Sequence, residues 1–167
     1  MNARFLLMCL AAIAASAAPF GASRAYAQLP AEVAAAPLSL ADAKKMIEAA
    51  QKTATDMNLR VSIAVVDARG DLIALGRMPG AGAATPDTAI GKAMLSVVYG
   101  QPSAALVQRA TSPITQAFND ATGGRLRFLQ GAVPIVRNGV IVGAVAASGA
   151  TSQQDEDIAK SGLRTIS

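Results

Sequence analysis

Apolar residues between positions 39 and 57 recur at three- and four-residue intervals, opposite a lysine-rich face. This spacing is typical of an amphipathic helix with one face in a core. Ser39 with Asp42 three positions later has the spacing of a capping box, which predicts that the helix begins there. The positions expected on the buried face are Leu40, Ala43, Ile47, Ala50, Ala54 and Met57.

The spacing then changes to that of strands. Branched residues alternate over residues 60–67, and a turn at residues 67–70 leads into an apolar run over 71–78. Alternation with period two, followed by a turn and a second such run, predicts a β-hairpin. Residues 79–82 (Pro-Gly-Ala-Gly) then break the pattern.

A second hairpin is predicted near the end of the chain. Residues 133–136 and 140–145 are apolar runs that flank Asn138-Gly139. Asn-Gly between two such runs is a strong hairpin signal, because both residues tolerate a positive φ. Pro134 has no N–H for a ladder hydrogen bond, so its strand is expected to begin at, or lie on, an edge of the sheet.

Helical patterns fill the remaining ordered segments. A helix is expected from about Thr85 to Gly100, and a shorter one follows with Ser103 as its cap. Ser152, with Asp155 three positions later, starts a terminal helix. Residues 110–125 are interpreted as a loop with one helical turn, a candidate lid. The order of elements predicts an α+β domain in which helices pack against an antiparallel sheet.

The N-terminus has the features of a secretory signal peptide over residues 1–27. Arg4 precedes a charge-free stretch of Leu and Ala, and residues 25–27 read Ala-Tyr-Ala, the form that a signal peptidase accepts. The alternative is an uncleaved anchor. Cleavage predicts a periplasmic or secreted protein with no stable membrane insertion, a flexible leader over residues 28–38 and a single domain over 39–167.

Charge and composition exclude several classes of function. The net charge of +4 falls to +2 once the predicted signal peptide, with its two arginines and no acid, is removed. No basic run accompanies this small excess, so no nucleic-acid partner is expected. The chain contains no histidine, which excludes Ser-His-Asp and Cys-His catalysis and the common His/Cys zinc sites.

Three residues are candidates for ligand chemistry, and each has a structural alternative. Lys92 lies in an apolar helical pattern, where it either extends its ammonium to solvent or pairs with a ligand carboxylate. Tyr99 is either a half-buried aromatic or a phenolate ligand to ferric haem. Gly131 precedes a strand, where a missing side chain permits close approach of a ligand or simply tight packing.

Three segments together resemble the GlcG/HbpS-like family, which includes the C-terminal domain of PduO-type proteins. They are residues 65–72 with the continuation to 81, the run Ala-Ile-Gly-Lys-Ala at 89–93 with Pro-Ser at 102–103, and residues 130–135 with Asn-Gly at 138–139 and Asp-Glu-Asp at 155–157. The resemblance spans about residues 39–165. It implies a five-stranded antiparallel sheet flanked by helices, profilin-like, assembling into homo-oligomers.

The resemblance also implies haem or a related tetrapyrrole as the ligand, in sensing, storage or protection against oxidative stress. Relatives often carry Asp where this chain has Pro79, and some offer a His that this chain lacks. Lys92 and Arg77 are then expected to pair with the propionates, and Tyr99 or Ser103 to approach the iron. The remaining candidates for the pocket are Met78, Gly131 and Pro134.

The sequence thus favours an exported small-molecule-binding module over an enzyme. Two alternatives stay open, a non-haem binder of carboxylates or corrinoids and a haem-degrading enzyme that uses carboxylates and Lys92.

Overall fold

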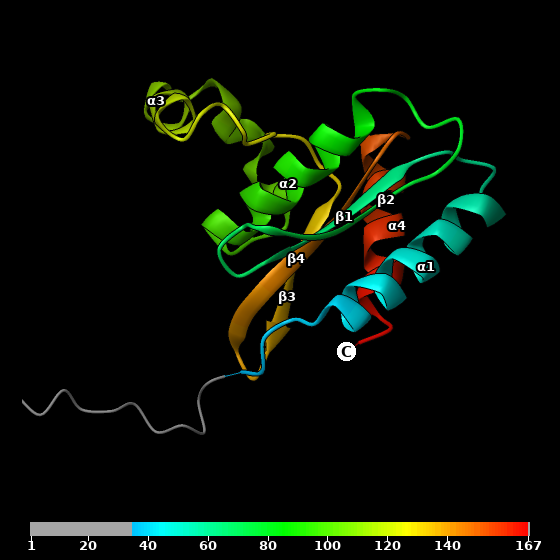
Figure 1. Ribbon diagram of the computed structural model, residues 1–167. Helices are drawn as coiled ribbons and strands as arrows, with labels where there is room; N and C mark the ends of the chain where they lie inside the picture. The colour runs from blue at the N-terminus through cyan, green and yellow to red at the C-terminus, as the bar shows by residue number, and fades with distance from the viewer. Residues whose placement is uncertain (1–34, 167) are drawn as a thin grey trace, which may run out of the picture. The chain divides into compact units, whose positions relative to one another are not determined.

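The computed structural model describes residues 35–166, which form an α+β arrangement of helices around a sheet (Figure 1). The predicted signal peptide lies outside the described residues. In chain order the elements are α1 (Leu40–Asp56), β1 (Ser62–Asp67), β2 (Leu72–Arg77), α2 (Thr85–Tyr99), the 3₁₀ helix η2 (Ser103–Thr111), α3 (Pro113–Ala121), β3 (Ala132–Arg137), β4 (Val140–Ser148) and α4 (Ser152–Leu163).

Both predicted hairpins are confirmed, and they meet at the centre of one antiparallel sheet. The strand order is β2-β1-β4-β3, and the central pair β1 and β4 sets Ser62 opposite Ser148. Strand β3 lies at an edge, as the proline at position 134 predicts.

The expectation of five strands is wrong for the described residues, whose sheet has four. The segment that precedes β3 lies against helix α2 instead of joining the sheet. There the Arg127 N–H donates a hydrogen bond to the Gly91 carbonyl of α2 at 3.2 Å. A backbone donor used in this way is not available for a strand ladder.

Helices cover both faces of the sheet, and each face has its own apolar core. Helices α1 and α4 pack on one face, where Ile63 and Val65 of β1 meet Met46 of α1. Helix α2 packs on the other face, where Val66, the next residue along β1, meets Leu95. Alternation along β1 thus divides its side chains between the two cores.

The start of α1 is fixed by the predicted capping box and by a contact from the second hairpin. Ser39 Oγ accepts from the Asp42 N–H, and Asp42 Oδ2 accepts from the Ser39 N–H. Arg137 at the end of β3 donates to Asp42 Oδ2 at 3.0 Å and to the Ala36 carbonyl at 3.2 Å. Leu38, placed in the predicted leader, belongs to the core and is only 9% exposed.

The interpretation of residues 110–125 as a loop with one helical turn is wrong. They contain the end of η2 and the nine-residue helix α3, which begins with a proline in its first turn. Only Thr115 of α3 is buried, whereas Ile114 is 83% exposed and Phe118 is 44% exposed. The apolar positions 114, 117, 118 and 121 have the spacing of one helical face, but the segment is short, and the prediction of a loop gave this spacing no weight.

None of the helices within residues 35–166 is long and apolar enough to cross a membrane.

Acid should weaken the contact between the second hairpin and α1. The Arg137 guanidinium beside Asp42 is the main cause that holds the pKa of this carboxyl below its ordinary value of 3.8. A lowered pKa stabilises the folded state above pH 3.8, and this stabilisation is lost as the pH falls through the folded-state pKa.

We therefore expect Arg137→Gln to lower the free energy of unfolding by up to about 1 kcal/mol at neutral pH, and by less at pH 3 or below. Urea unfolding across pH measures this difference. Arg69→Gln is the control, because Arg69 is 80% exposed beside its partners Asp67 and Asp71. A deficit for Arg137→Gln that stays constant across pH would contradict the assignment.

Candidate functional site

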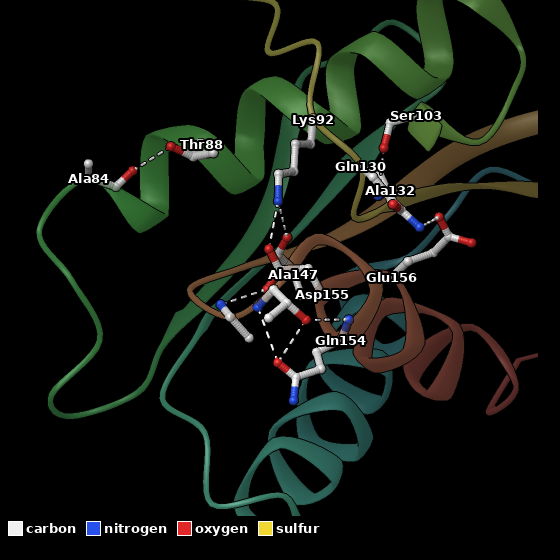
Figure 2. A network of polar contacts seen from close by, with 12 residues as sticks. Ala84, Thr88, Lys92, Ser103, Gln130, Ala132, Ala147, Gln154, Asp155 and Glu156 are labelled. Atoms are coloured by element: carbon white, nitrogen blue, oxygen red, sulfur yellow. Dashed lines mark hydrogen bonds and ion pairs between the residues drawn. The ribbon is translucent and has the colours of Figure 1, made fainter. Parts of the chain in front are cut away.

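A buried ion pair joins the two helical layers past one end of the sheet (Figure 2). Lys92 comes from α2 and Asp155 from the first turn of α4, and their Nζ and Oδ2 atoms lie 2.7 Å apart. Each side chain is 3% exposed. The ammonium also donates to the Ala147 carbonyl at 3.2 Å, and Asp155 Oδ1 accepts from the Ala150 N–H at 3.0 Å.

Gly131 makes room for this pair. A Cβ at position 131 would lie 2.8 Å from Lys92 Nζ, 2.8 Å from Asp155 Cβ and 2.9 Å from the Ala147 carbonyl oxygen. Its φ of +135° is also a conformation that residues with a side chain rarely adopt. Of the two explanations for a small residue here, close packing of protein groups is the one that the structure shows.

The carboxyl of this pair is under opposing influences. Burial, the largest of them, raises the pKa of Asp155, while the hydrogen bond and the charge of Lys92 oppose that rise. The terminal helix is capped by Thr151 instead of the predicted Ser152, and Gln154 completes its capping box. Asp155 therefore has no capping role in α4 and is available to Lys92.

The Lys92 ammonium is already bonded to protein groups. Its ammonium does not extend to solvent, because the residue is 2% exposed. A ligand propionate would have to displace Asp155 from it. The sequence placed Asp155 in a helical first turn but gave no sign of this pairing, since 63 positions separate it from Lys92.

Ser103 lies close to Gly131 and also serves the backbone. It is completely buried, and its Oγ accepts a hydrogen bond from the Ala132 N–H at 2.9 Å (Figure 2). It does not cap η2, as the sequence predicted, because Pro102 occupies that position without a side-chain hydrogen bond. Pro134, two residues along β3 from Ala132, is half-buried.

The predicted site residues at the two ends of α2 are not brought together. Arg77 pairs with Ser62 across β1 and β2, and the Ser62 hydroxyl bonds that of Thr85, the first residue of α2. Tyr99 is the last residue of α2, about 21 Å further along a 15-residue helix. Arg77 Nη2 donates to the Ala81 carbonyl at 2.7 Å.

Met78 also lies apart from Tyr99. It is 8% exposed and belongs to the core beneath α1 and α4.

Tyr99 opens onto a cleft of about 340 Å³ between the end of α2 and helix α3. We call this the aromatic cleft, and it is lined by Val98, Tyr99, Arg109, Ile114, Thr115 and Phe118. The Tyr99 ring meets Phe128 edge to face with centroids 6.3 Å apart, and the Arg109 Cζ lies 5.3 Å from the Tyr99 centroid. The Tyr99 hydroxyl has no hydrogen-bond partner among residues 35–166.

Most of this cleft was missed from the sequence. Arg109, Ile114 and Phe118 fall in or next to the segment interpreted as a loop, so no site was assigned to them. The available signal was the four-residue spacing of Ile114 and Phe118, which places both on one side of a helix.

No group of three or more His, Cys, Asp or Glu side chains that could hold a metal ion occurs within residues 35–166. The chain also has no histidine, and the residue at the aromatic cleft whose side chain is a known type of ligand for ferric haem is Tyr99.

The family model described as "Haem degrading protein HbpS-like" matches residues 38–164, which is nearly the whole described domain. The chain belongs to the HbpS-like family. The predicted family is thereby confirmed. Among curated relatives, Protein GlcG of Escherichia coli (strain K12) is 37% identical over 116 residues, covering 66% of this chain and 81% of GlcG.

A second curated relative is an uncharacterized 15.0 kDa protein in the dhaT-dhaS intergenic region of Citrobacter freundii. It is 30% identical over 141 residues, covering 79% of this chain and 94% of the relative.

Solved structures of this family share the fold. A double mutant of Streptomyces reticuli HbpS matches with a TM-score of 0.70 and 30% identity, covering 80% of this chain and 89% of that chain. The structure of a PduOC:heme complex matches with a TM-score of 0.70 and 26% identity, covering 78% of this chain and 96% of the other.

Removing one charge of the Lys92–Asp155 ion pair should destabilise this HbpS-like domain more than removing both charges. Lys92→Met leaves a buried carboxylate without its cation, and we expect a loss of about 3–5 kcal/mol in the free energy of unfolding at pH 7. The double variant Lys92→Met/Asp155→Asn should lose much less, since the amide oxygen still accepts from the Ala150 N–H. Urea unfolding of both single variants and the double variant measures the coupling.

The deficit of Lys92→Met should shrink on acidification. Lys92 lowers the pKa of Asp155, so its removal lets burial raise this pKa further. Asp155 then takes up a proton at a higher pH in the folded state than in the unfolded chain. Stability relative to wild type then rises as the pH falls toward about 4. A deficit independent of pH, or a double variant as unstable as Lys92→Met, would show that the charges do not interact as described.

Gly131→Ala should cost more stability than the same change at another glycine with positive φ. Gly139, with φ +77°, is the matched control because a Cβ there meets nothing within 4 Å. We expect Gly139→Ala to cost about 1 kcal/mol from backbone strain alone. Gly131→Ala should cost about 3 kcal/mol or more, because φ +135° is less accessible to alanine and because the added Cβ would displace the ion pair. Equal losses, measured by thermal unfolding, would remove Gly131 from its role beside the pair.

Proposed function

We propose that this protein is an exported haem-binding module, and that Tyr99 in the aromatic cleft is its iron ligand. The observation that carries the proposal is Tyr99 itself, which is half-buried, lines the aromatic cleft and has a hydroxyl with no hydrogen-bond partner among residues 35–166. Membership of the HbpS-like family and the likeness to the PduOC:heme complex support haem as the ligand.

The residues at the cleft suit the chemistry of haem. The macrocycle is apolar and flat, and Val98, Ile114 and Phe118 offer exposed apolar surface to it. The Arg109 guanidinium, over the Tyr99 ring, is the cation placed to pair with a propionate. Bound haem would supply a ferric iron, for which a tyrosine oxygen is a known protein ligand.

This proposal changes the roles expected from the sequence. Arg109 takes the place expected for Arg77 and Lys92, because Lys92 is already paired and Arg77 lies at the opposite end of α2. Tyr99 is preferred to Ser103, whose hydroxyl is fully buried and accepts from the Ala132 N–H.

Binding fits the cleft better than catalysis does. The residues that line it include no carboxylate, lysine or histidine, and the one general acid or base type among them, the phenol of Tyr99, is the proposed iron ligand. A role in haem sensing, storage or protection against oxidative stress requires binding alone. The features of residues 1–27 support export to the periplasm or the exterior.

A ferric haem titration of the purified protein, followed at the Soret band, tests this function. We expect a saturable shift at one haem per chain for the wild type, and an altered band with at least about tenfold weaker binding for Tyr99→Phe, which keeps the ring and removes the donor. Such a loss corresponds to about 1.4 kcal/mol.

Three further variants sharpen the result. Phe118→Ala should weaken binding, while Leu72→Ala should not, because Leu72 is similarly exposed (47% against 44%) but lies on β2. Ser103→Ala should leave the band position unchanged. An unshifted wild-type spectrum would overturn haem as the ligand, and a wild-type spectrum from Tyr99→Phe would overturn Tyr99 as the iron ligand.

A further inference from the structure

A second cleft, distinct from the aromatic cleft, lies between helix α2 and the segment that leads to β3. We call it the arginine cleft. It encloses about 290 Å³, and the side chains that decide its chemistry are Asp87, Ile90, Met94, Arg125 and Arg127. None of these five residues lines the aromatic cleft.

One wall of the arginine cleft is the segment that contains Arg125 and Arg127. This segment can lie directly against α2 because Gly91 has no side chain. A Cβ at this position would lie 2.5 Å from the Arg125 carbonyl oxygen and 2.5 Å from Arg127 Cγ. The Gly91 carbonyl accepts from the Arg127 N–H at 3.2 Å. The segment therefore rests directly on the helix backbone, and any larger residue would push it away.

Further hydrogen bonds brace this segment from behind. Arg127 Nη1 donates to the Gly124 carbonyl at 2.6 Å and to the Leu126 carbonyl at 3.3 Å. Asn119 of α3 accepts from the Leu126 N–H through its Oδ1 at 2.9 Å. The Arg127 guanidinium is thus held in place before any ligand arrives, which reduces the entropy that binding costs.

The charges at the cleft are not neutralised by neighbours. Within residues 35–166, Arg125, Arg127 and Asp87 form no ion pair, and Arg125 is exposed. Two guanidinium groups and one carboxylate leave a net charge of one positive unit at the cleft. Guanidinium groups bind carboxylates strongly, through paired N–H donors.

The apolar residues that line the arginine cleft favour a ligand that also has an apolar portion. Ile90 and Met94 lie one turn apart on α2, about 6 Å along the helix axis, and form a short apolar floor. The volume lies at the lower limit of small-molecule pockets, which run from about 300 to 1,000 Å³. The occupant is therefore small, with an apolar stem that covers the floor.

We propose that the arginine cleft binds a small aliphatic monocarboxylate. The carboxylate pairs with Arg125 and lies beside the braced Arg127, and the stem covers Ile90 and Met94. Asp87, one turn before Ile90, repels a second carboxylate and so selects monocarboxylates over dicarboxylates. This site does not depend on haem binding at Tyr99.

Titration of the purified, haem-free protein with hexanoate, followed by amide NMR, tests the proposal. We expect saturable shifts at Gly91, Gly124 and Arg125, and none with hexanamide, which has the same stem without the charge. Arg125→Gln should weaken hexanoate binding at least about fivefold. Arg164→Gln is the control for loss of one exposed arginine, because Arg164 lies at the end of α4 on the other face of the sheet.

Asp87→Asn tests the selectivity separately from binding. Adipate is the six-carbon dicarboxylate, and it should bind to the wild type with lower affinity than hexanoate. Asp87→Asn should reduce this difference in affinity between the two ligands. Absence of saturable shifts with hexanoate, or unchanged affinity in Arg125→Gln, would overturn the site. Because the protein carries no haem in this experiment, its outcome is independent of the Soret titration.

Discussion

One buried contact links the two helical layers directly, the ion pair of Lys92 and Asp155. The two residues come from helices on opposite faces of the sheet, and they meet past its end at Gly131. Apolar packing holds each helix to its own face, but it is not directional and does not fix one layer relative to the other. A buried charge pair is directional, because both partners lose much of their stabilisation if either moves away. We infer that this pair sets the position of α2 relative to α4.

Fixing α2 also fixes the places where ligands are proposed to bind. The aromatic cleft lies at its C-terminal end, around Tyr99, and the arginine cleft lies along its middle, around Gly91. Neither cleft uses the ammonium of Lys92. The helix thus combines a structural interior side with an outer side available for binding, and a single segment, residues 112–128, contributes to both clefts.

The fold was largely predictable because its signals are local. Alternation of branched residues, the Asn138-Gly139 turn and the capping box at Ser39 each act within a few positions, and each was confirmed. The family was predictable from the order and spacing of three segments. The number of strands was not, because the fifth was expected only from the resemblance and no residue pattern required it.

The site was less predictable because its contacts are long-range. Nothing near Lys92 in the sequence indicates a partner 63 positions away. The spacing of Ile114 and Phe118 indicates a helical face, but it does not show that this face lies beside Tyr99. Tyr99 was recognised as a candidate from its chemistry alone. Its neighbours Arg109 and Phe128 come from separate segments and required the folded chain.

The hydroxyl of Ser103 has a consequence for how copies of this protein can associate. Residues two apart on a strand direct their backbone groups to the same side, so the N–H of Ala132 and the nitrogen of Pro134 both face away from β4. The Ala132 N–H already donates to Ser103 Oγ, and the Pro134 nitrogen has no hydrogen to donate. An incoming strand would find no free donor at either position, which protects this edge from strand-to-strand polymerisation. Association of copies on this side is therefore expected to use side chains more than a continued sheet.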